Sequence, residues 1–195
     1  MLLITHILSS ITVGIIFGLI SKKDYTINSK VLPNKKIEKI CGFSNLGEIL
    51  ASSIISSIKT ILLIGGFVVI FSCLISILNE SKFMYILTTF LAPILNIFKI
   101  PSSFIISFFT GILELTNGIH LVSNIACKHI SINIIVTAFL LGFGGISVFL
   151  QVFSIISRSD LSIKPYIYGK LLQGIIASLY TYILIYIFNF FNFNL

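Results

Sequence analysis

The chain has 195 residues, of which 56% are hydrophobic and only 10% are charged, with a mean hydropathy of +1.10. This composition excludes a soluble globular domain and indicates an all-α polytopic membrane protein, with residues 1–195 forming a single integral membrane domain. The net charge of +7 does not indicate nucleic-acid binding, because the lysines lie mainly between apolar stretches, where an orientation signal explains them better.

Six apolar segments are predicted along the chain. They are residues 2–20, 46–78, 83–98, 103–126, 132–156 and 168–191. The first is expected to be a retained span rather than a cleaved signal peptide, because its basic residues follow the apolar run and no small-residue cleavage site is present. The second is longer than one span requires. Its amphipathic start at residues 47–53 is expected to lie at the interface, with the span itself beginning near Lys59.

The basic residues predict the orientation of these segments. If all six cross, the loops at 21–44, 99–101 and 157–170 share one side. These loops carry ten Lys and Arg residues, whereas the opposite loops hold only Lys82 and Lys128. Cytoplasmic loops are enriched in Lys and Arg, so the basic loop 21–44 is expected in the cytoplasm and both termini on the other side. A re-entrant hairpin in either interrupted segment would reverse every later assignment.

The fourth segment is interrupted by Glu114-Leu115-Thr116-Asn117-Gly118. An ionisable side chain within a membrane segment is costly and marks a functional site by default, and Asn-Gly favours a turn rather than a helix. The segment is therefore expected to break or re-enter, which requires burial in protein or a cavity. Glu114, Thr116, Asn117 and Gly118 are candidates for a substrate or ion pathway. His120 is a candidate proton relay, although a lone histidine is more often a packed residue.

The fifth segment is interrupted by Gly142-Phe143-Gly144-Gly145. Two adjacent broken helices are how many secondary transporters build a site in the middle of the membrane, because half-helix N-termini offer unpaired N–H groups. Gly144 and Gly145 would let the backbone approach a ligand, and Gln151 would add an amide near the same depth. The alternative is close helix packing through small residues.

Two lysines are candidates for the positive charge of such a site. Lys59 lies within an apolar run, and Lys170 lies near the start of the sixth segment. Either would serve as a counter-ion for Glu114 or for an anionic substrate. The alternatives are that Lys59 extends to the membrane interface and that Lys170 is an ordinary cytoplasmic anchor.

The chain lacks the signatures of membrane enzymes. It has no His-Glu-x-x-His, Gly-x-Ser-x-Gly or Walker sequence, and Glu114 has no second intramembrane carboxylate with which to share acid–base work. Its three cysteines lack metal or redox spacing. No enzymatic activity, metal or cofactor is expected. Without an ATP site, transport would use a gradient or be passive.

Two stretches, residues 111–118 (GILELTNG) and 143–151 (FGGISVFLQ), are specific in combination. Together with Leu63-Ile64-Gly65-Gly66 and with Tyr168 and Lys170, they resemble the C-terminal half of the sporulation integral membrane protein YlbJ family, also called SpoVV. That family carries a membrane domain of the nucleoside-recognition or gate type. The resemblance covers nearly the whole chain.

The resemblance implies a protein of the outer forespore membrane of endospore-forming bacteria that moves dipicolinic acid toward the spore. Dipicolinate is a small dianion, which broken-helix N-termini and Lys59 or Lys170 would suit. Family members are about twice as long, so a second half-chain or a homo-oligomer is expected to supply the other wall of the site. The expected partners are therefore a small anionic metabolite, the lipid bilayer and that second chain.

Two other functions stay open from the sequence. One is a scaffold for spore maturation that does not transport, in which the broken helices are packing features and the loop 21–44 recruits a partner. The other is a nucleoside transporter, which depends only on the relationship to the gate domain.

Overall fold

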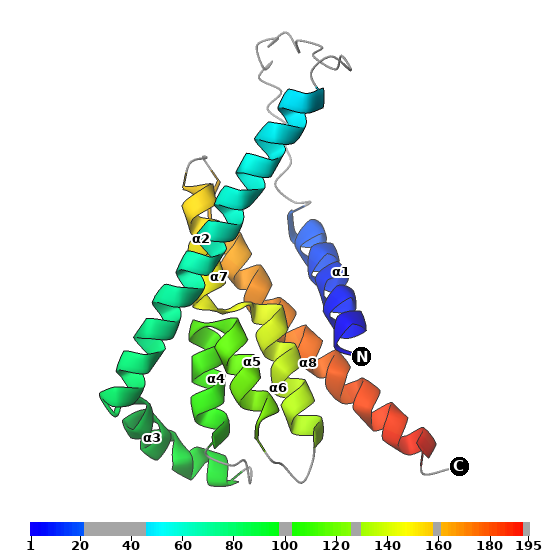
Figure 1. Ribbon diagram of the computed structural model, residues 1–195. Coiled ribbons are helices and arrows are strands. Elements are labelled where there is room, and N and C mark those ends of the chain that lie inside the picture. The colour runs from blue at the N-terminus through cyan, green and yellow to red at the C-terminus, as the bar shows by residue number, and fades with distance from the viewer. Residues whose placement is uncertain (22–45, 98–102, 126–129, 158–160, 193–195) are drawn as a thin grey trace.

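The computed structural model describes residues 1–21, 46–97, 103–125, 130–157 and 161–192, and the regular elements of these residues are all helices (Figure 1). In chain order they are α1 (Leu2–Ser21), α2 (Leu46–Glu80), α3 (Phe83–Ile97), α4 (Ser103–Leu113), α5 (Leu115–Ser123), α6 (Ile130–Phe143), α7 (Gly145–Ile156) and α8 (Lys164–Asn192). The helices α1, α2 and α8 and the α6–α7 pair are long and apolar enough to cross a bilayer. The prediction of an all-α polytopic membrane protein is confirmed.

Helix α6 lies at the centre of the packing, against α8, α1 and the α4–α5 pair. The backbones of α6 and α8 meet at two glycines, since a Cβ added to Gly142 would lie 2.7 Å from the Cα of Gly174. Phe104, Val122 and Leu140 form a buried cluster where α4, α5 and α6 meet. Many large apolar side chains elsewhere are exposed, which suits a surface in contact with lipid.

The fourth predicted segment is a re-entrant hairpin. Helices α4 and α5 run side by side in opposite directions, so that Ser103 and Ser123 lie at the same end of the molecule (Figure 1). A Cβ added to Gly118 would overlap the Cα of Gly111 and lie 2.5 Å from its nitrogen. The hairpin therefore closes because both helices carry a glycine where they touch.

The arrangement in which all six segments cross is wrong. Helix α3 lies across the end of the molecule where the α4–α5 hairpin opens, so neither the third nor the fourth segment crosses (Figure 1). Because the third and fourth segments both fail to cross, the later segments keep their predicted direction. Helices α1 and α7 end at the same end of the molecule at which α2 and α8 begin. The basic residues therefore still predict that this end is cytoplasmic. Among the three loops predicted on the cytoplasmic side, residues 99–101 are the exception, because the end of α3 and the start of α4 lie at the opposite end; Lys99 itself lies outside the described residues.

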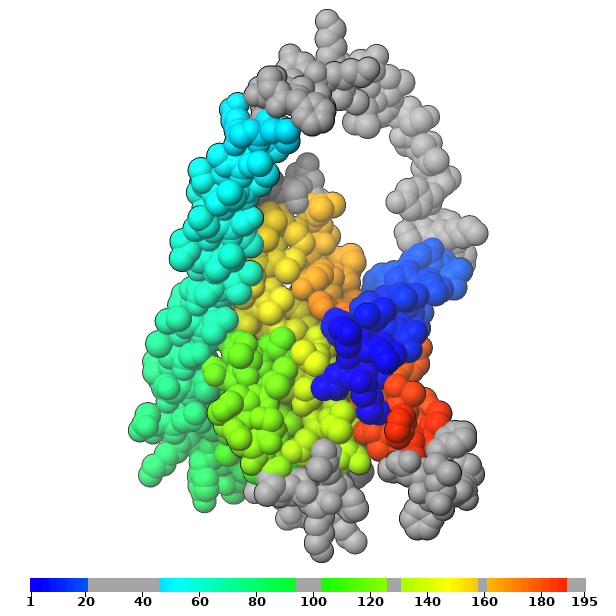
Figure 2. Space-filling view, turned by 45° about the vertical axis from the view of Figure 1, so that its right-hand side comes forward, coloured from blue at the N-terminus to red at the C-terminus, as the bar shows by residue number. Residues whose placement is uncertain are grey.

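Helix α2 is continuous over 35 residues, or about 52 Å. No break separates residues 47–53 from the stretch that begins near Lys59, and the position of the interface along α2 stays a prediction. The helix is longer than the ~30 Å hydrocarbon core, so it tilts or extends beyond the core. Figure 2 shows its first half standing apart from α1.

Candidate functional site

The two predicted interruptions are each one residue wide. Glu114 separates α4 from α5, and Gly144 separates α6 from α7. The chain reverses direction at Glu114 but continues upward in Figure 1 past Gly144. The prediction of two broken segments is confirmed, and the two breaks have different geometries.

The first break is closed by its own carboxylate. Glu114 has an extended backbone (φ −141°, ψ 119°) and caps α5: its Oε1 accepts from Thr116 N at 3.0 Å and its Oε2 from Asn117 N at 2.7 Å. Its side chain is 2% exposed. A carboxylate at a helix N-terminus satisfies free N–H groups and interacts favourably with the helix dipole. The N-terminus of α5 is therefore occupied by the protein itself.

The other residues of this motif lie on different sides of α5. The Asn117 Nδ2 donates to Ser72 Oγ on α2 at 2.8 Å, which ties the hairpin to α2. Thr116 is exposed, whereas Gly118 is buried against Gly111. Sequence reasoning assigned no role to Ser72, although it is a hydroxyl within an apolar run.

The second break has no such cap. Gly144 has a left-handed backbone (φ 90°, ψ −15°), and as a glycine it gives the N-terminus of α7 no side-chain cap. Gly145 also has a positive φ of 82°. Only glycine adopts these conformations readily, so the two glycines allow α7 to restart after the break. The Ser147 hydroxyl in the first turn of α7 is buried without a hydrogen-bond partner.

The two breaks lie against each other. A Cβ added to Gly145 would lie 3.2 Å from the carbonyl oxygen of Gly111 and 3.3 Å from the nitrogen of Leu115, at the tip of the hairpin. The structure therefore brings together the two motifs that the sequence predicted to face each other. Helix α7 runs away from the hairpin tip, so its N-terminus lies at this contact.

Lys170 is half-buried and lies beside the second break. Its Nζ donates to Gly142 O at 3.4 Å and to Gln173 Oε1 at 3.2 Å, and its Cε lies 4.0 Å from the position of a Cβ built on Gly144. The Gln173 Nε2 in turn donates to Ser10 Oγ on α1 at 2.7 Å. This chain of polar groups positions the ammonium beside the start of α7.

Lys170 forms no ion pair with any described carboxylate. The described acidic residues are Glu48, Glu80 and Glu114, and Glu114 already accepts two backbone hydrogen bonds. A cation inside a membrane protein is a functional-site hypothesis by default, and here the ammonium is held by the Gly142 carbonyl and by Gln173. Gln173, to which the sequence analysis gave no role, lies one helical turn after Lys170, and this spacing was the available signal.

Three further candidates lie away from the contact between the breaks. Gln151 is half-buried on α7, six residues or about 9 Å beyond Gly145. Lys59 is exposed on α2 and lines a pocket against the far end of α7. His120 is exposed on α5, where its ring nitrogen lies 3.4 Å from Asn124 Nδ2.

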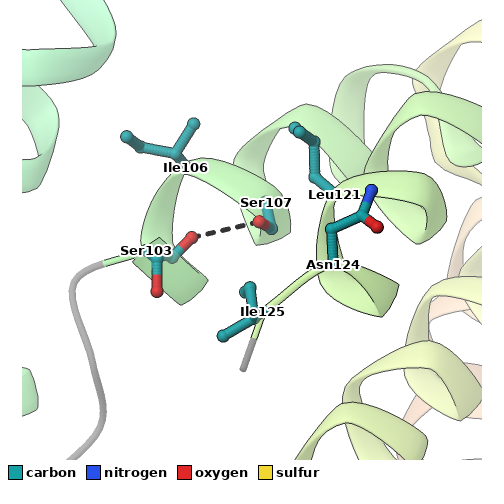
Figure 3. Close-up of a pocket in the computed structure, with 6 residues that line it drawn as sticks. All are labelled: Ser103, Ile106, Ser107, Leu121, Asn124 and Ile125. Carbon is teal, nitrogen blue, oxygen red and sulfur yellow. Dashed lines mark hydrogen bonds between the residues drawn. The ribbon is translucent and has the colours of Figure 1, made fainter. Parts of the chain in front are cut away.

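A pocket of about 420 Å³ lies at the open end of the hairpin, away from its tip (Figure 3). It is lined by Ser103, Ile106, Ser107, Leu121, Asn124 and Ile125. Its polar groups serve the helices themselves: Ser107 Oγ donates to Ser103 O at 3.0 Å and Asn124 Nδ2 to His120 O at 2.9 Å. None of the predicted site residues lines this pocket.

Known proteins match the part of the chain that holds these features. Residues 61–159 match the Gate family, described as nucleoside recognition. The chain is also 36% identical over 139 residues to the sporulation integral membrane protein YlbJ of Bacillus subtilis (strain 168). The aligned residues make up 71% of this chain and 34% of that protein, so the chain spans about a third of its relative.

No solved structure matches the chain significantly. The residues that match the Gate family make up half of the chain and include both helix breaks, the hairpin and the part of α2 that packs on it. The similarity to YlbJ agrees with the resemblance that the sequence motifs predict. The chain therefore belongs to the Gate, or nucleoside-recognition, family.

Proposed function

We propose that this chain is a component of a membrane transport protein that moves a small anionic metabolite during endospore formation. The observation that carries the proposal is the contact of the two helix breaks beside the Lys170 ammonium. The similarity to a sporulation membrane protein supports the biological setting.

The second break supports an anion as the substrate. The N-terminus of α7 has no side-chain cap, its Ser147 hydroxyl is unpaired, and Lys170 has no described counter-ion. Helix N-termini bind anions through free N–H groups and the helix dipole. In this proposal the anion contacts the first turn of α7 and Lys170, while Glu114 keeps the end of α5 closed.

Dipicolinic acid is the substrate that we propose, and the outer forespore membrane is the proposed location. Dipicolinate carries two carboxylates on a small planar ring, so one carboxylate would suit the start of α7 and the other Lys170. The chain spans about a third of its relative, so we propose that a second half-chain or a second copy supplies the opposite wall.

Nucleoside transport is the second candidate, because the Gate family is described as nucleoside recognition. A nucleoside has no carboxylate, so it would not require the charge of Lys170. The effect of removing that charge on each substrate therefore separates the two candidates.

The test replaces the native gene by a Lys170→Gln variant and measures the dipicolinate content of spores. We expect at least a tenfold fall with an unchanged protein level, because the substituted amide keeps hydrogen bonding but removes the cation. Lys164→Gln, at the exposed start of α8, is the matched control and should leave the content unchanged. Normal dipicolinate in the Lys170→Gln spores, or uptake of labelled nucleosides that depends on this gene, would contradict the anion proposal.

A further inference from the structure

A second polar region lies between α2 and the far end of α7, near the end of the molecule where α2 begins. A pocket of about 400 Å³ is lined there by Ser56, Lys59, Thr60 and Leu63 of α2 and by Ser154 and Ile155 of α7. Only Lys59 among these residues was considered in the transport site above.

The first half of α2 is amphipathic, and the pocket indicates which way it faces. Ser56, Lys59 and Thr60 line the pocket toward α7. Ile58, Ile61 and Leu62 do not line it and are 51%, 67% and 69% exposed. A membrane helix turns its apolar face to lipid and its polar face to protein or water. The polar face of α2 therefore borders a pocket rather than packed side chains.

The charge of Lys59 is uncompensated within the described residues. Its ammonium makes no hydrogen bond or ion pair there. The preceding acidic residue on the same helix, Glu48, lies eleven residues or about 16 Å earlier along the axis. That separation exceeds the screening length of about 8 Å at physiological ionic strength.

The neighbouring hydroxyl groups do not neutralise the charge of Lys59. The Thr60 hydroxyl donates to Ser56 O at 2.9 Å and the Ser154 hydroxyl to Gln151 O at 2.7 Å. Both protons are thus used within their own helices, and no acidic side chain lines the pocket among the residues that the structure describes. Lys59 therefore sets the sign of the potential inside the pocket.

We propose that the pocket between α2 and α7 is a water-filled, electropositive vestibule through which small anions enter from the end where α2 begins. Lys59 concentrates carboxylate-bearing solutes there before they reach the start of α7. The identity of the solute depends on the proposed function, but the water content and the charge of the vestibule do not.

Cysteine labelling tests the vestibule without measuring transport. In the full chain with Cys41, Cys73 and Cys127 replaced by Ser, Ser56→Cys is compared with Ile58→Cys, two residues away on the other face of α2. Membranes are treated with an anionic (sulfonatoethyl) or a cationic (trimethylammoniumethyl) methanethiosulfonate. We expect Ser56→Cys to react at least tenfold faster than Ile58→Cys.

The charge of Lys59 is tested by the preference between the two reagents. At Ser56→Cys we expect the rate ratio of the anionic to the cationic reagent to fall about twentyfold when Lys59→Gln is added, because a unit charge about 4 Å away in water changes each rate about fivefold and acts in opposite directions on the two reagents. Lys59→Arg should preserve the ratio. Ser154→Cys, on the opposite wall, repeats the measurement in case a substitution in α2 disturbs insertion.

Two results would overturn the inference. Equal and slow labelling at Ser56→Cys, Ser154→Cys and Ile58→Cys would show that the pocket is dry. A reagent ratio that is unchanged by Lys59→Gln would show that this lysine does not set its potential. Either result would leave the dipicolinate test of Lys170 unaffected, so failure of the vestibule and failure of the transport proposal are distinguishable.

Discussion

At the α4–α5 break the chain reverses, and the carboxylate of Glu114 fills the N-terminus of α5 with two hydrogen bonds. At the α6–α7 break the chain continues, and the left-handed backbone of Gly144 leaves the N-terminus of α7 without a side-chain cap. Both half-helices present the same free N–H groups and the same dipole. They differ in whether the protein supplies the anion.

This difference suggests different roles for the two breaks: the first stabilises the hairpin, and the second is the proposed binding site. The break at Glu114 is internally neutralised, so it stabilises a hairpin that re-enters the membrane. The break at Gly144 has a neighbouring cation in Lys170 and no anion among the described residues. The proposed function accordingly places the external anion at α7 rather than at α5. The predictions that follow test this division, from the largest expected effect to the smallest.

The glycine contact that closes the hairpin should be the feature most sensitive to substitution. In Gly118→Ala the added Cβ would overlap the Cα of Gly111, and backbone atoms cannot move aside as a flexible side chain can. We expect a loss of about 3 kcal/mol in the free energy of unfolding. Thermal unfolding in detergent measures it. Gly65→Ala on α2, where a Cβ would have no atom within 4 Å, is the control, and an equal loss in both would mean that the hairpin is not closed at Gly118.

Removing the Glu114 carboxylate that caps α5 should lower the free energy of unfolding. Glu114→Ala leaves the buried end of α5 without its acceptors, and a lost cap costs about 0.5–2 kcal/mol. Glu114→Gln keeps one acceptor oxygen and should lose about half as much. Unfolding in detergent again provides the measurement. Equal stability of Glu114→Ala and the unchanged chain would show that the carboxylate is free for a ligand, as the sequence analysis expected.

Much of the fold was predictable from local chemistry. Asn117-Gly118 and Gly144-Gly145 disfavour a continuous helix, so each break followed from the residues that form it. The contact between the breaks was also predicted, because paired broken helices recur in transporters. The direction of the chain after each break was not predictable, because it depends on the contact between Gly111 and Gly118, which hydropathy does not report.

The candidate site was predicted only in part, for a related reason. The sequence shows that Glu114 is an ionisable group in an apolar segment, but not that its own helix satisfies both of its oxygens. Lys170 was an equal candidate with Lys59, and the structure places it beside Gly144 because the glycine pair Gly142–Gly174 brings α8 close to α6. Such choices depend on tertiary packing rather than on spacing in the sequence.

The smallest expected effect concerns the link between the first break and α2. The hydrogen bond from Asn117 Nδ2 to Ser72 Oγ predicts that Asn117→Ala and Ser72→Ala each cost about 0.6 kcal/mol and that the double variant costs little more than either. A double-mutant cycle of unfolding in detergent measures this coupling.

The dipicolinate content of spores then distinguishes a structural role of Asn117, as a brace between α5 and α2, from a contact with the substrate. If Asn117 acts as a brace, both single variants lower the content to the same small extent. If Asn117→Ala abolishes it while Ser72→Ala does not, Asn117 contacts the substrate, and the first break belongs to the binding site after all.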